Sequence, residues 1–381
     1  MIARSVRNAG LVLLIFIVAP SIKTSCLADE LDRARLIAAA RAGGDYLIRM
    51  QRPDGSFHYS YNARQDRFDS QAYNILRHAG VTLSLLELYA ATRDIRYLDS
   101  ARRAIEFLKT RFRPARDKSS LYVLDFDGKA KLGANGLALY VFARQLELDA
   151  KNGDRKSAAR LASHIRSMQH KDGSFASYYR LRGHEPQGSV SLYYPGEAIL
   201  GLVALFKMNG DRRLIDSARR GADYLIESQK QMDYLPPDAW LMQALEALHK
   251  IGREQRYASH AIDLAEAMIA HQYAASAPDG YEGGFGPGRP RATPAASRAE
   301  GMLAAYRLAR VTGDARASVI ASALKASARF QLSHQLEAGS SLINPKRAAG
   351  GFRASAGSWR VRIDSVQHNI SSLLGIAEAL Y

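Results

Sequence analysis

Apolar residues recur along most of the chain with helical spacing, in two kinds of segment that alternate. One kind has a single apolar stripe and a charged face, which is typical of a helix at the surface. These segments span residues 33–51, 95–112, 154–169, 212–229, 256–272 and 316–335. The other kind is apolar on most sides, as expected of a helix that other helices cover. These segments span residues 70–91, 131–149, 195–208, 237–250, 295–310 and 362–380. The pattern predicts six outer and six inner helices in strict alternation.

Polar junctions between these segments support the alternation. Four junctions place an Asp at the expected N-cap of an outer helix, where its side chain can accept a hydrogen bond from a free amide of the first turn. They are Asp94, Asp154, Asp211 and Asp314. Gly stands before three of these aspartates, where the preceding helix needs a residue with positive φ.

One loop sequence occurs twice. Gln51–Phe57 reads QRPDGSF, and Gln169–Phe175, 118 residues later, reads QHKDGSF. This separation equals two units of about 59 residues, and a fixed period of this size indicates a repeated structural unit. In each copy Gly permits a tight turn, Asp can bond the turn amides and Phe can pack back between helices. The repeat predicts an all-α (α/α)6 toroid of six helical hairpins, with residues 29–381 as a single domain.

The corner sequence GGDYLIRMQRPDGSF resembles the repeat of prenyltransferases and squalene cyclases. As six hairpins, the chain also looks like the toroids that process glycans, which include hydrolases, lyases and epimerases. The segments YNILRHAG, YYPGEAILGL and RIDSVQHNISSLLG look like segments of exported bacterial toroids of this kind. The acidic motif of squalene-type cyclases is only approximated, by Asp125–Asp127. Protein prenyltransferases and lanthionine cyclases bind zinc through cysteine, and Cys26 is the only cysteine.

The first 28 residues have the pattern of a secretory signal peptide. A basic start precedes an apolar run over residues 11–19, and the small residue Ala28 stands before the first acidic residues. The apolar run is too short for a membrane span. Cleavage after Ala28 would remove Cys26. We therefore expect an exported protein, periplasmic or secreted, without disulfides or a transmembrane anchor.

The chain is basic, with 53 Lys and Arg against 37 Asp and Glu. Removal of Arg4, Arg7 and Lys23 with the signal peptide leaves a net charge of +13. A charge of this size favours an anionic partner, although charge also serves solubility alone. Export and the lack of a Lys/Arg tract with interleaved aromatic residues disfavour nucleic acid as the partner.

Chemistry is expected where the inner helices begin, because in a toroid these N-termini point into one funnel. Acidic residues stand near the start of four inner helices, and each alone could simply cap its helix. Two carboxyl groups about 5 to 10 Å apart suit glycoside hydrolysis, and neighbouring helix tips can supply them. The candidate catalytic residues are Glu197, Asp238, Glu300 and Asp364, together with His78.

A second set of residues suits binding or a different reaction. The first and last inner helices bring together Arg, Asn and His, which in polysaccharide lyases neutralise a uronate carboxylate and remove a proton. The candidate substrate-binding residues are Tyr73, Asn74, Arg77, Tyr193, Tyr194, Trp240, Arg298, Arg362, His368 and Asn369. The two histidines, His78 and His368, could also be ordinary core residues. No metal-ligand spacing such as HxxxH occurs, and neither a metal nor a cofactor is expected.

The longest Gly/Pro-rich insertion spans residues 277–294. It is expected to be either a lid over the funnel or a surface loop. Its aromatic residues, Tyr281 and Phe285, could stack on sugar rings or seal the fifth corner as Phe57 seals the first.

These features leave three functions open for an exported toroid whose partner is a polysaccharide or oligosaccharide, acidic in keeping with the charge. Hydrolysis leads because acids come from four helix tips. A polysaccharide lyase or uronyl C5-epimerase is the first alternative, because Arg, Asn and His gather at the first and last inner helices. The second alternative is a non-catalytic toroid that binds a polysaccharide or an envelope polymer.

Overall fold

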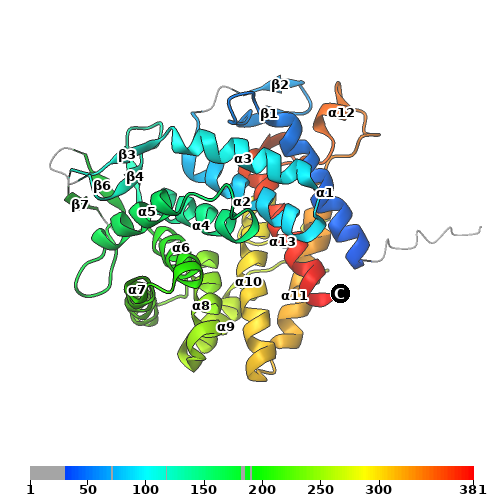
Figure 1. Ribbon diagram of the computed structural model, residues 1–381. Helices are drawn as coiled ribbons and strands as arrows, with labels where there is room; N and C mark the ends of the chain where they lie inside the picture. Colours follow the sequence, from blue (N-terminus) through cyan, green and yellow to red (C-terminus); the bar gives the residue numbers. More distant parts are fainter. Residues whose placement is uncertain (1–30, 70–71, 117, 182–184, 189–190) are drawn as a thin grey trace, which may run out of the picture. The chain divides into compact units, whose positions relative to one another are not determined.

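The computed structural model describes residues 31–69, 72–116, 118–181, 185–188 and 191–381. Within these residues two sets of six helices alternate along the chain (Figure 1). The inner helices are α2 (Ile75–Thr92), α4 (Leu132–Leu148), α6 (Tyr194–Asn209), α8 (Ala239–Gly252), α10 (Ala292–Thr312) and α13 (Ile363–Leu380). The outer helices are α1 (Arg33–Met50), α3 (Ile95–Lys109), α5 (Arg155–Ser167), α7 (Arg212–Lys230), α9 (Gln255–Ile269) and α11 (Ala317–Leu332). A single-turn helix, α12 (Pro345–Ala348), lies in the loop before α13.

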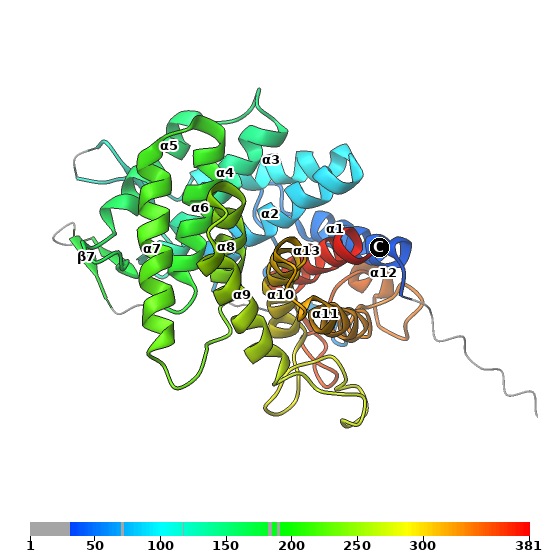
Figure 2. The same cartoon turned by 90° about the horizontal axis from the view of Figure 1, so that it is seen from below.

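The inner helices form a closed ring. Each packs against the next in the order α2, α4, α6, α8, α10 and α13, and α13 packs against α2. Figure 2 shows the outer helices on the outside of this ring. The predicted (α/α)6 toroid is therefore confirmed, although some helix boundaries differ from the prediction. The first inner helix begins at Ile75 rather than residue 70, because Asn74 caps it by accepting a hydrogen bond from the Arg77 amide at 3.0 Å.

Short antiparallel strands occur in the loops that lead from outer to inner helices. They are β1 (Ser60–Asn62), β2 (Arg67–Phe68), β3 (Phe112–Pro114), β4 (Leu121–Val123), β5 (Ala130–Lys131), β6 (Tyr178–Arg180), β7 (Glu185–Gln187) and β8 (Arg360–Arg362). The strand orders of the three sheets are β2-β1-β8, β3-β4 and β5-β6-β7. In the first sheet Ser60 pairs with Arg362, so the first corner of the ring is joined to the entry of the last inner helix.

The corner predicted from the repeated loop occurs four times in the described residues. In each corner the Gln at the end of an outer helix forms a β-bridge with a Phe in the following loop. The pairs are Gln51 with Phe57, Gln169 with Phe175, Gln272 with Phe285 and Gln335 with Phe352. Phe285 is buried in this way, which supports the corner alternative for its role. Tyr281 packs on Tyr273 with ring centroids 5.3 Å apart.

Each of these glutamines also ties its outer helix to another outer helix. The amide Nε2 of Gln51 donates to Ser100 O of α3 at 2.9 Å, and that of Gln335 donates to Ala39 O of α1 at 2.8 Å. The second bond joins the last outer helix to the first. A glycine with positive φ completes the corner, and at Gly350 (φ +81) a Cβ would lie only 2.0 Å from Ala42 O. The corner is thus a joint between neighbouring outer helices as well as a turn.

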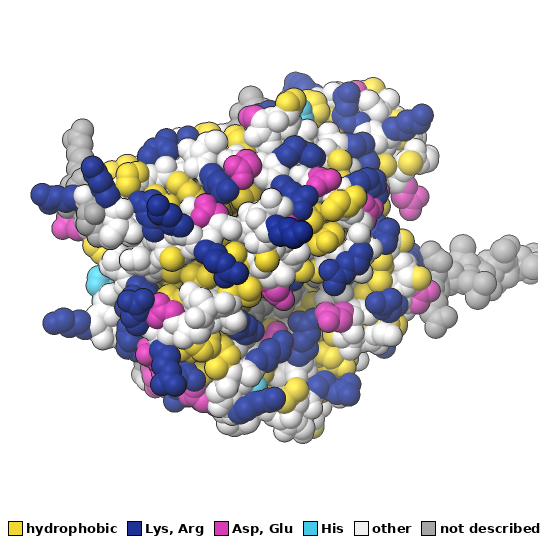
Figure 3. All heavy atoms as spheres, in the orientation of Figure 1, with side chains coloured by type: hydrophobic (Ala, Val, Ile, Leu, Met, Phe, Trp, Pro, Cys, Tyr) yellow, Lys and Arg dark blue, Asp and Glu magenta, His cyan; other side chains and the backbone are white. Residues whose placement is uncertain are grey.

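The predicted signal peptide lies outside the described residues. Leu31–Tyr381 form one compact unit. No helix among the described residues is long and apolar enough to cross a membrane. On the face that Figure 3 shows, Lys and Arg side chains are spread among acidic and apolar ones rather than gathered in one patch.

The joint made by Gln335 leads to a stability prediction. Gln335→Ala removes the donor to Ala39 O and Gly350 O, and we expect the free energy of unfolding to fall by about 1 to 3 kcal/mol. Urea unfolding followed by circular dichroism measures this loss. Gln255→Ala at an exposed position of α9 is the control and should change stability by less than about 0.5 kcal/mol. Equal effects of the two substitutions would contradict the role of the joint.

Candidate functional site

A cavity of about 360 Å³ lies where the inner helices begin, and all six contribute side chains to it. Eight of the residues predicted for the site line this cavity. They are Arg77, Tyr193, Glu197, Trp240, Arg298, Arg362, Asp364 and His368. The structure therefore brings together polar residues from α2, α6, α8, α10 and α13 that are far apart in the sequence.

Asp364 is held between two arginines. Its carboxylate accepts hydrogen bonds from Arg362 Nε at 2.5 Å and Nη2 at 2.7 Å, and Arg77 Nε lies 3.0 Å from Oδ2. Burial raises the pKa of Asp364, but the hydrogen bonds and charges of the two arginines outweigh burial and hold this pKa below its usual value. Arg77 also donates to the hydroxyl of Tyr59. This network fixes both guanidinium groups at the cavity.

His368 and Glu300 form a second ion pair. Nδ1 of His368, on α13, lies 3.0 Å from Oε1 and 3.2 Å from Oε2 of Glu300, on α10. Burial lowers the pKa of His368, but the charge and hydrogen bond of Glu300 outweigh burial and leave this pKa above the ordinary value. Nε2 of His368 has no hydrogen-bond partner among the described residues. The Trp240 ring lies 6.2 Å from the imidazole, and both rings line the cavity.

Glu197 and Asp238 form a third group, which has no cationic partner among the described residues. Both are almost fully buried, and Glu197 Oε2 and Asp238 Oδ2 have no hydrogen-bond partner there. The other oxygen of Asp238 caps α8 by accepting from the Leu241 amide at 3.0 Å. Burial raises the pKa of Asp238 to about 7, and burial and the charge of Asp238 raise that of Glu197 well above its usual value. Burial without a cation therefore favours the protonated form of both carboxyl groups.

Arg298 adds a positive charge to the cavity. No carboxylate pairs with it among the described residues, and its guanidinium carbon lies 5.1 Å from the centre of the Phe285 ring. Burial lowers the pKa of Arg298, but arginine keeps its charge at any ordinary pH. With Asp364 shared between two arginines, the three arginines of the cavity carry more positive charge than the carboxylate beside them neutralises.

Seven of the fifteen predicted residues do not line the cavity. Two of them, Asp238 and Glu300, act on Glu197 and His368, which do line it. The other five lie elsewhere. His78 is buried against the first corner, with Nε2 2.8 Å from Ala104 O and Nδ1 2.8 Å from the Tyr73 hydroxyl. Burial lowers the pKa of His78 to about 4, so this histidine is neutral at physiological pH. Asn74 caps α2, Tyr194 packs against α4 beside Gly133, and Asn369 donates to Ser365 O within α13. We therefore leave all five out of the proposed site.

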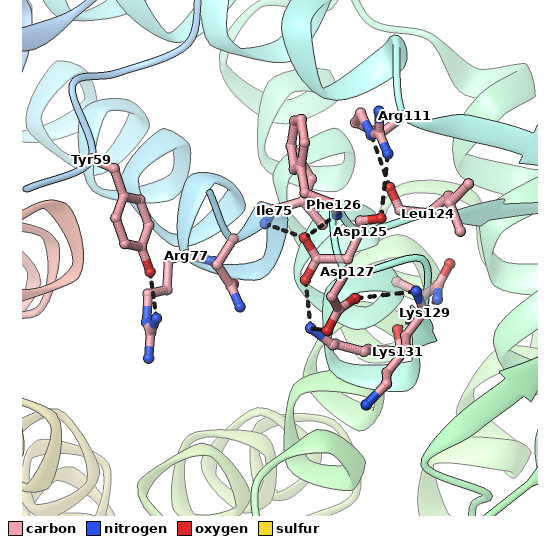
Figure 4. Close-up of polar contacts among 12 residues, drawn as sticks. Tyr59, Ile75, Arg77, Arg111, Leu124, Asp125, Phe126, Asp127, Lys129 and Lys131 are labelled. Carbon is pink, nitrogen blue, oxygen red and sulfur yellow. Dashed lines mark hydrogen bonds and ion pairs between the residues drawn. The ribbon is translucent and has the colours of Figure 1, made fainter. Parts of the chain in front are cut away.

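An ion pair that the sequence analysis did not anticipate sets the position of α2. Figure 4 shows Asp125 accepting from the Ile75 amide at 2.9 Å and the Phe126 amide at 2.7 Å, while Lys131 Nζ lies 2.6 Å from Oδ2. Asp127 Oδ2 binds the same ammonium group at 2.7 Å. Asp125 and Lys131 are buried, and they join the starts of α2 and α4. The Asp125–Asp127 motif thus has a structural role here.

The fold is shared with solved enzymes that act on sugars. No protein-family model and no curated protein matches the sequence. The α-1,6-mannanase of Salegentibacter is 13% identical with a TM-score of 0.65, and the match covers 90% of this chain and 99% of the mannanase. Cellobiose 2-epimerase of Bacillus thermoamylovorans is 13% identical with a TM-score of 0.67 (91% and 99% covered). A D-mannose isomerase is 14% identical with a TM-score of 0.64 (91% and 97% covered).

The chain has the (α/α)6 toroid fold. The similarity extends over about nine tenths of the chain. At these identities the similarity concerns the fold, and the chemistry has to be argued from the cavity itself.

The arginine pair leads to a prediction about stability and pH. Asp364→Asn should lower the free energy of unfolding by about 1 to 3 kcal/mol at pH 7, because two partly buried guanidinium groups lose their anion. The pKa of Asp364 is lowered in the folded protein, so its contribution is present above the unfolded value of 3.8 and is lost as pH falls through the folded pKa.

Urea unfolding at pH 7 and near pH 3 tests this prediction. The difference between wild type and Asp364→Asn should shrink at the lower pH. A difference that stays constant would show that the ion pairs do not carry the effect. Asp99→Asn, which removes a more exposed ion pair with Arg102, should cost clearly less.

Proposed function

We propose that this protein is an enzyme that acts on acidic carbohydrates, and that His368 removes a proton from a carbon next to a carboxylate. This is the chemistry of uronyl epimerases and lyases. The observation that supports this proposal most strongly is that His368, paired with Glu300, lines a cavity with three arginines. We also propose that residues 1–28 direct export, as their sequence pattern indicates.

His368 has the arrangement of a general base. An Nδ1–H that donates to Glu300 fixes the ring and its tautomer, which leaves the lone pair on Nε2 for a substrate in the cavity. Glu300 also stabilises the imidazolium that forms when Nε2 accepts a proton. General-base catalysis of this kind contributes about 10² to 10⁴ in rate.

The arginines provide the complementary charge. Proton removal beside a carboxylate places a second negative charge on that group, and fixed guanidinium groups stabilise it. Arg77 and Arg362 are positioned by Asp364, whereas Arg298 comes from a different helix and has no competing carboxylate among the described residues. Trp240 and Tyr193 supply aromatic faces for a sugar ring, and Tyr193 is 42% exposed.

Hydrolysis is the second candidate, and the Glu197–Asp238 pair favours it. A buried carboxyl group with a raised pKa suits a general acid for a glycosidic oxygen. Two mannanase structures are of variants described as inactive, in which two consecutive aspartates are replaced. This chain has no two consecutive aspartates. A hydrolase built on this cavity would therefore need a different pair of carboxyl groups from the one replaced in the mannanase.

A deuterium-exchange experiment tests the proposal. The protein is incubated in D₂O with polymannuronate, polygalacturonate and heparosan, and with cellobiose and mannotriose as neutral controls. We expect deuterium at the carbon beside the carboxylate of one uronate polymer and none in the neutral sugars, as nuclear magnetic resonance can measure. New reducing ends without exchange or ultraviolet absorbance would indicate hydrolysis instead. Binding without exchange, absorbance or reducing ends would contradict the proposal that the protein is an enzyme that acts on these polymers.

Substitution of the base gives the next prediction. His368→Gln should slow exchange at least about 100-fold, because Gln cannot accept the proton. His170→Gln at an exposed corner position is the control and should keep wild-type exchange. Comparable rates for wild type and His368→Gln would remove His368 from the mechanism.

The pH dependence gives a further prediction. The base acts when neutral, so kcat/KM should rise with pH through the raised pKa of His368. In Glu300→Gln the carboxylate that raises this pKa is absent while burial still lowers it, so the acidic limb should move to lower pH and the plateau should fall. An acidic limb that does not move in Glu300→Gln would contradict the pairing as the source of the pKa.

A further inference from the structure

The cavity has titratable groups on opposite walls. The inner ring runs α2, α4, α6, α8, α10, α13, so α6 stands three helices from α13 in either direction. Glu197 lies in the first turn of α6 and His368 near the start of α13, and both line the cavity. A sugar bound between them would present one face to His368 and the other to Glu197.

The contacts of Glu197 indicate that it does not serve only to stabilise the fold. It is 2% exposed, and a Cβ at Gly133 would lie 2.0 Å from its Oε2, so this oxygen lies against the backbone of α4. Oε2 has no hydrogen-bond partner among the described residues, nor has Asp238 Oδ2. A buried carboxyl group without partners destabilises the fold, so its presence indicates a function other than stability. The nearest charged neighbour that affects Glu197 is Asp238, so no cation compensates a negative charge there.

We propose that Glu197, buried in the cavity wall without a cationic partner, is the second proton-transfer residue of the site and delivers a proton to the face of the sugar opposite His368. This inference rests on the proposed function and specifies it as epimerisation. His368 Nε2 takes the proton, and the C–H electron pair moves into the enolate of the carboxylate, which the arginines stabilise. The enolate then forms a new C–H bond with the proton from Glu197. Exchange of both groups with solvent restores their starting states, and the sugar keeps its composition.

Glu197 also has a role in the reverse direction, in which it is the base and His368 is the acid. Asp238 does not line the cavity itself; it caps α8, and its charge disfavours ionisation of Glu197. In a lyase the bond to the oxygen on the adjacent carbon breaks and no proton returns to the first carbon. The opposite-wall arrangement therefore favours inversion over elimination.

The test compares inversion with exchange in Glu197→Gln, a substitution of nearly equal shape. With a uronate polymer that the wild type exchanges in D₂O, we expect Glu197→Gln to keep exchange at the original configuration, because His368 can remove and return a proton. Inversion should fall at least about 100-fold. His368→Gln should lose both. Wild-type inversion in Glu197→Gln, or an unsaturated uronate product from the wild type, would overturn the inference.

A second measurement needs no substrate. Infrared difference spectra of the folded protein at pH 7 should show a protonated carboxyl band that is missing in Glu197→Gln and remains in Asp364→Asn, whose carboxylate is ionised. Circular dichroism confirms that each variant is folded. Identical carboxyl bands in wild type and Glu197→Gln would overturn the assignment of Glu197 as the proton donor, whatever the substrate. Failure of every polymer to exchange would instead count against the proposed function of His368.

Discussion

The hydrogen bond from each corner glutamine to a neighbouring outer helix is the interaction on which the ring depends. It joins neighbouring outer helices at the four described corners, and the bond from Gln335 to Ala39 O joins the last outer helix to the first. Each outer helix is followed by an inner helix that runs in the opposite direction. Because this order repeats around the ring, all six inner helices begin at the same end. The cavity is the product of that convergence, since its polar side chains come from all but one of the inner helices.

In and behind the wall of the cavity, the carboxyl group is placed in three different environments. Asp364 lies between two arginines and is ionised, and Glu300 is paired with an imidazole. Glu197 and Asp238 have no cationic partner among the described residues. Burial acts on all of them and disfavours charge, so the neighbours decide which carboxyl groups keep a proton. In the proposed epimerisation these environments serve as the anion-binding end, the oriented base and the proton donor.

Much of the fold was predictable because helix periodicity, N-caps and the repeated loop are local features. The corner at Phe285 was expected only as one of two alternatives, and the one at Phe352 was missed, because the loops from Gln272 to Phe285 and from Gln335 to Phe352 are longer than in the first two, although GGF ends both. The site was predictable as a set of helix starts, but the direction of a side chain was not. His78 faces α3, where its Nε2 lies 2.8 Å from Ala104 O, and the helical pattern did not give this direction. Lys131 was overlooked because the folding of the loop before α4 brings it to Asp125, six residues earlier in the sequence.

In the proposed mechanism the cavity holds a uronate between three arginines, His368 and Glu197. A crystal structure of the protein with a uronate trisaccharide tests this claim most directly. We predict a carboxylate within about 3 Å of Arg298 and at least one of Arg77 and Arg362, with the adjacent carbon between His368 Nε2 and Glu197. A sugar bound elsewhere on the ring, or one whose carboxylate points away from the arginines, would contradict the proposed uronate site.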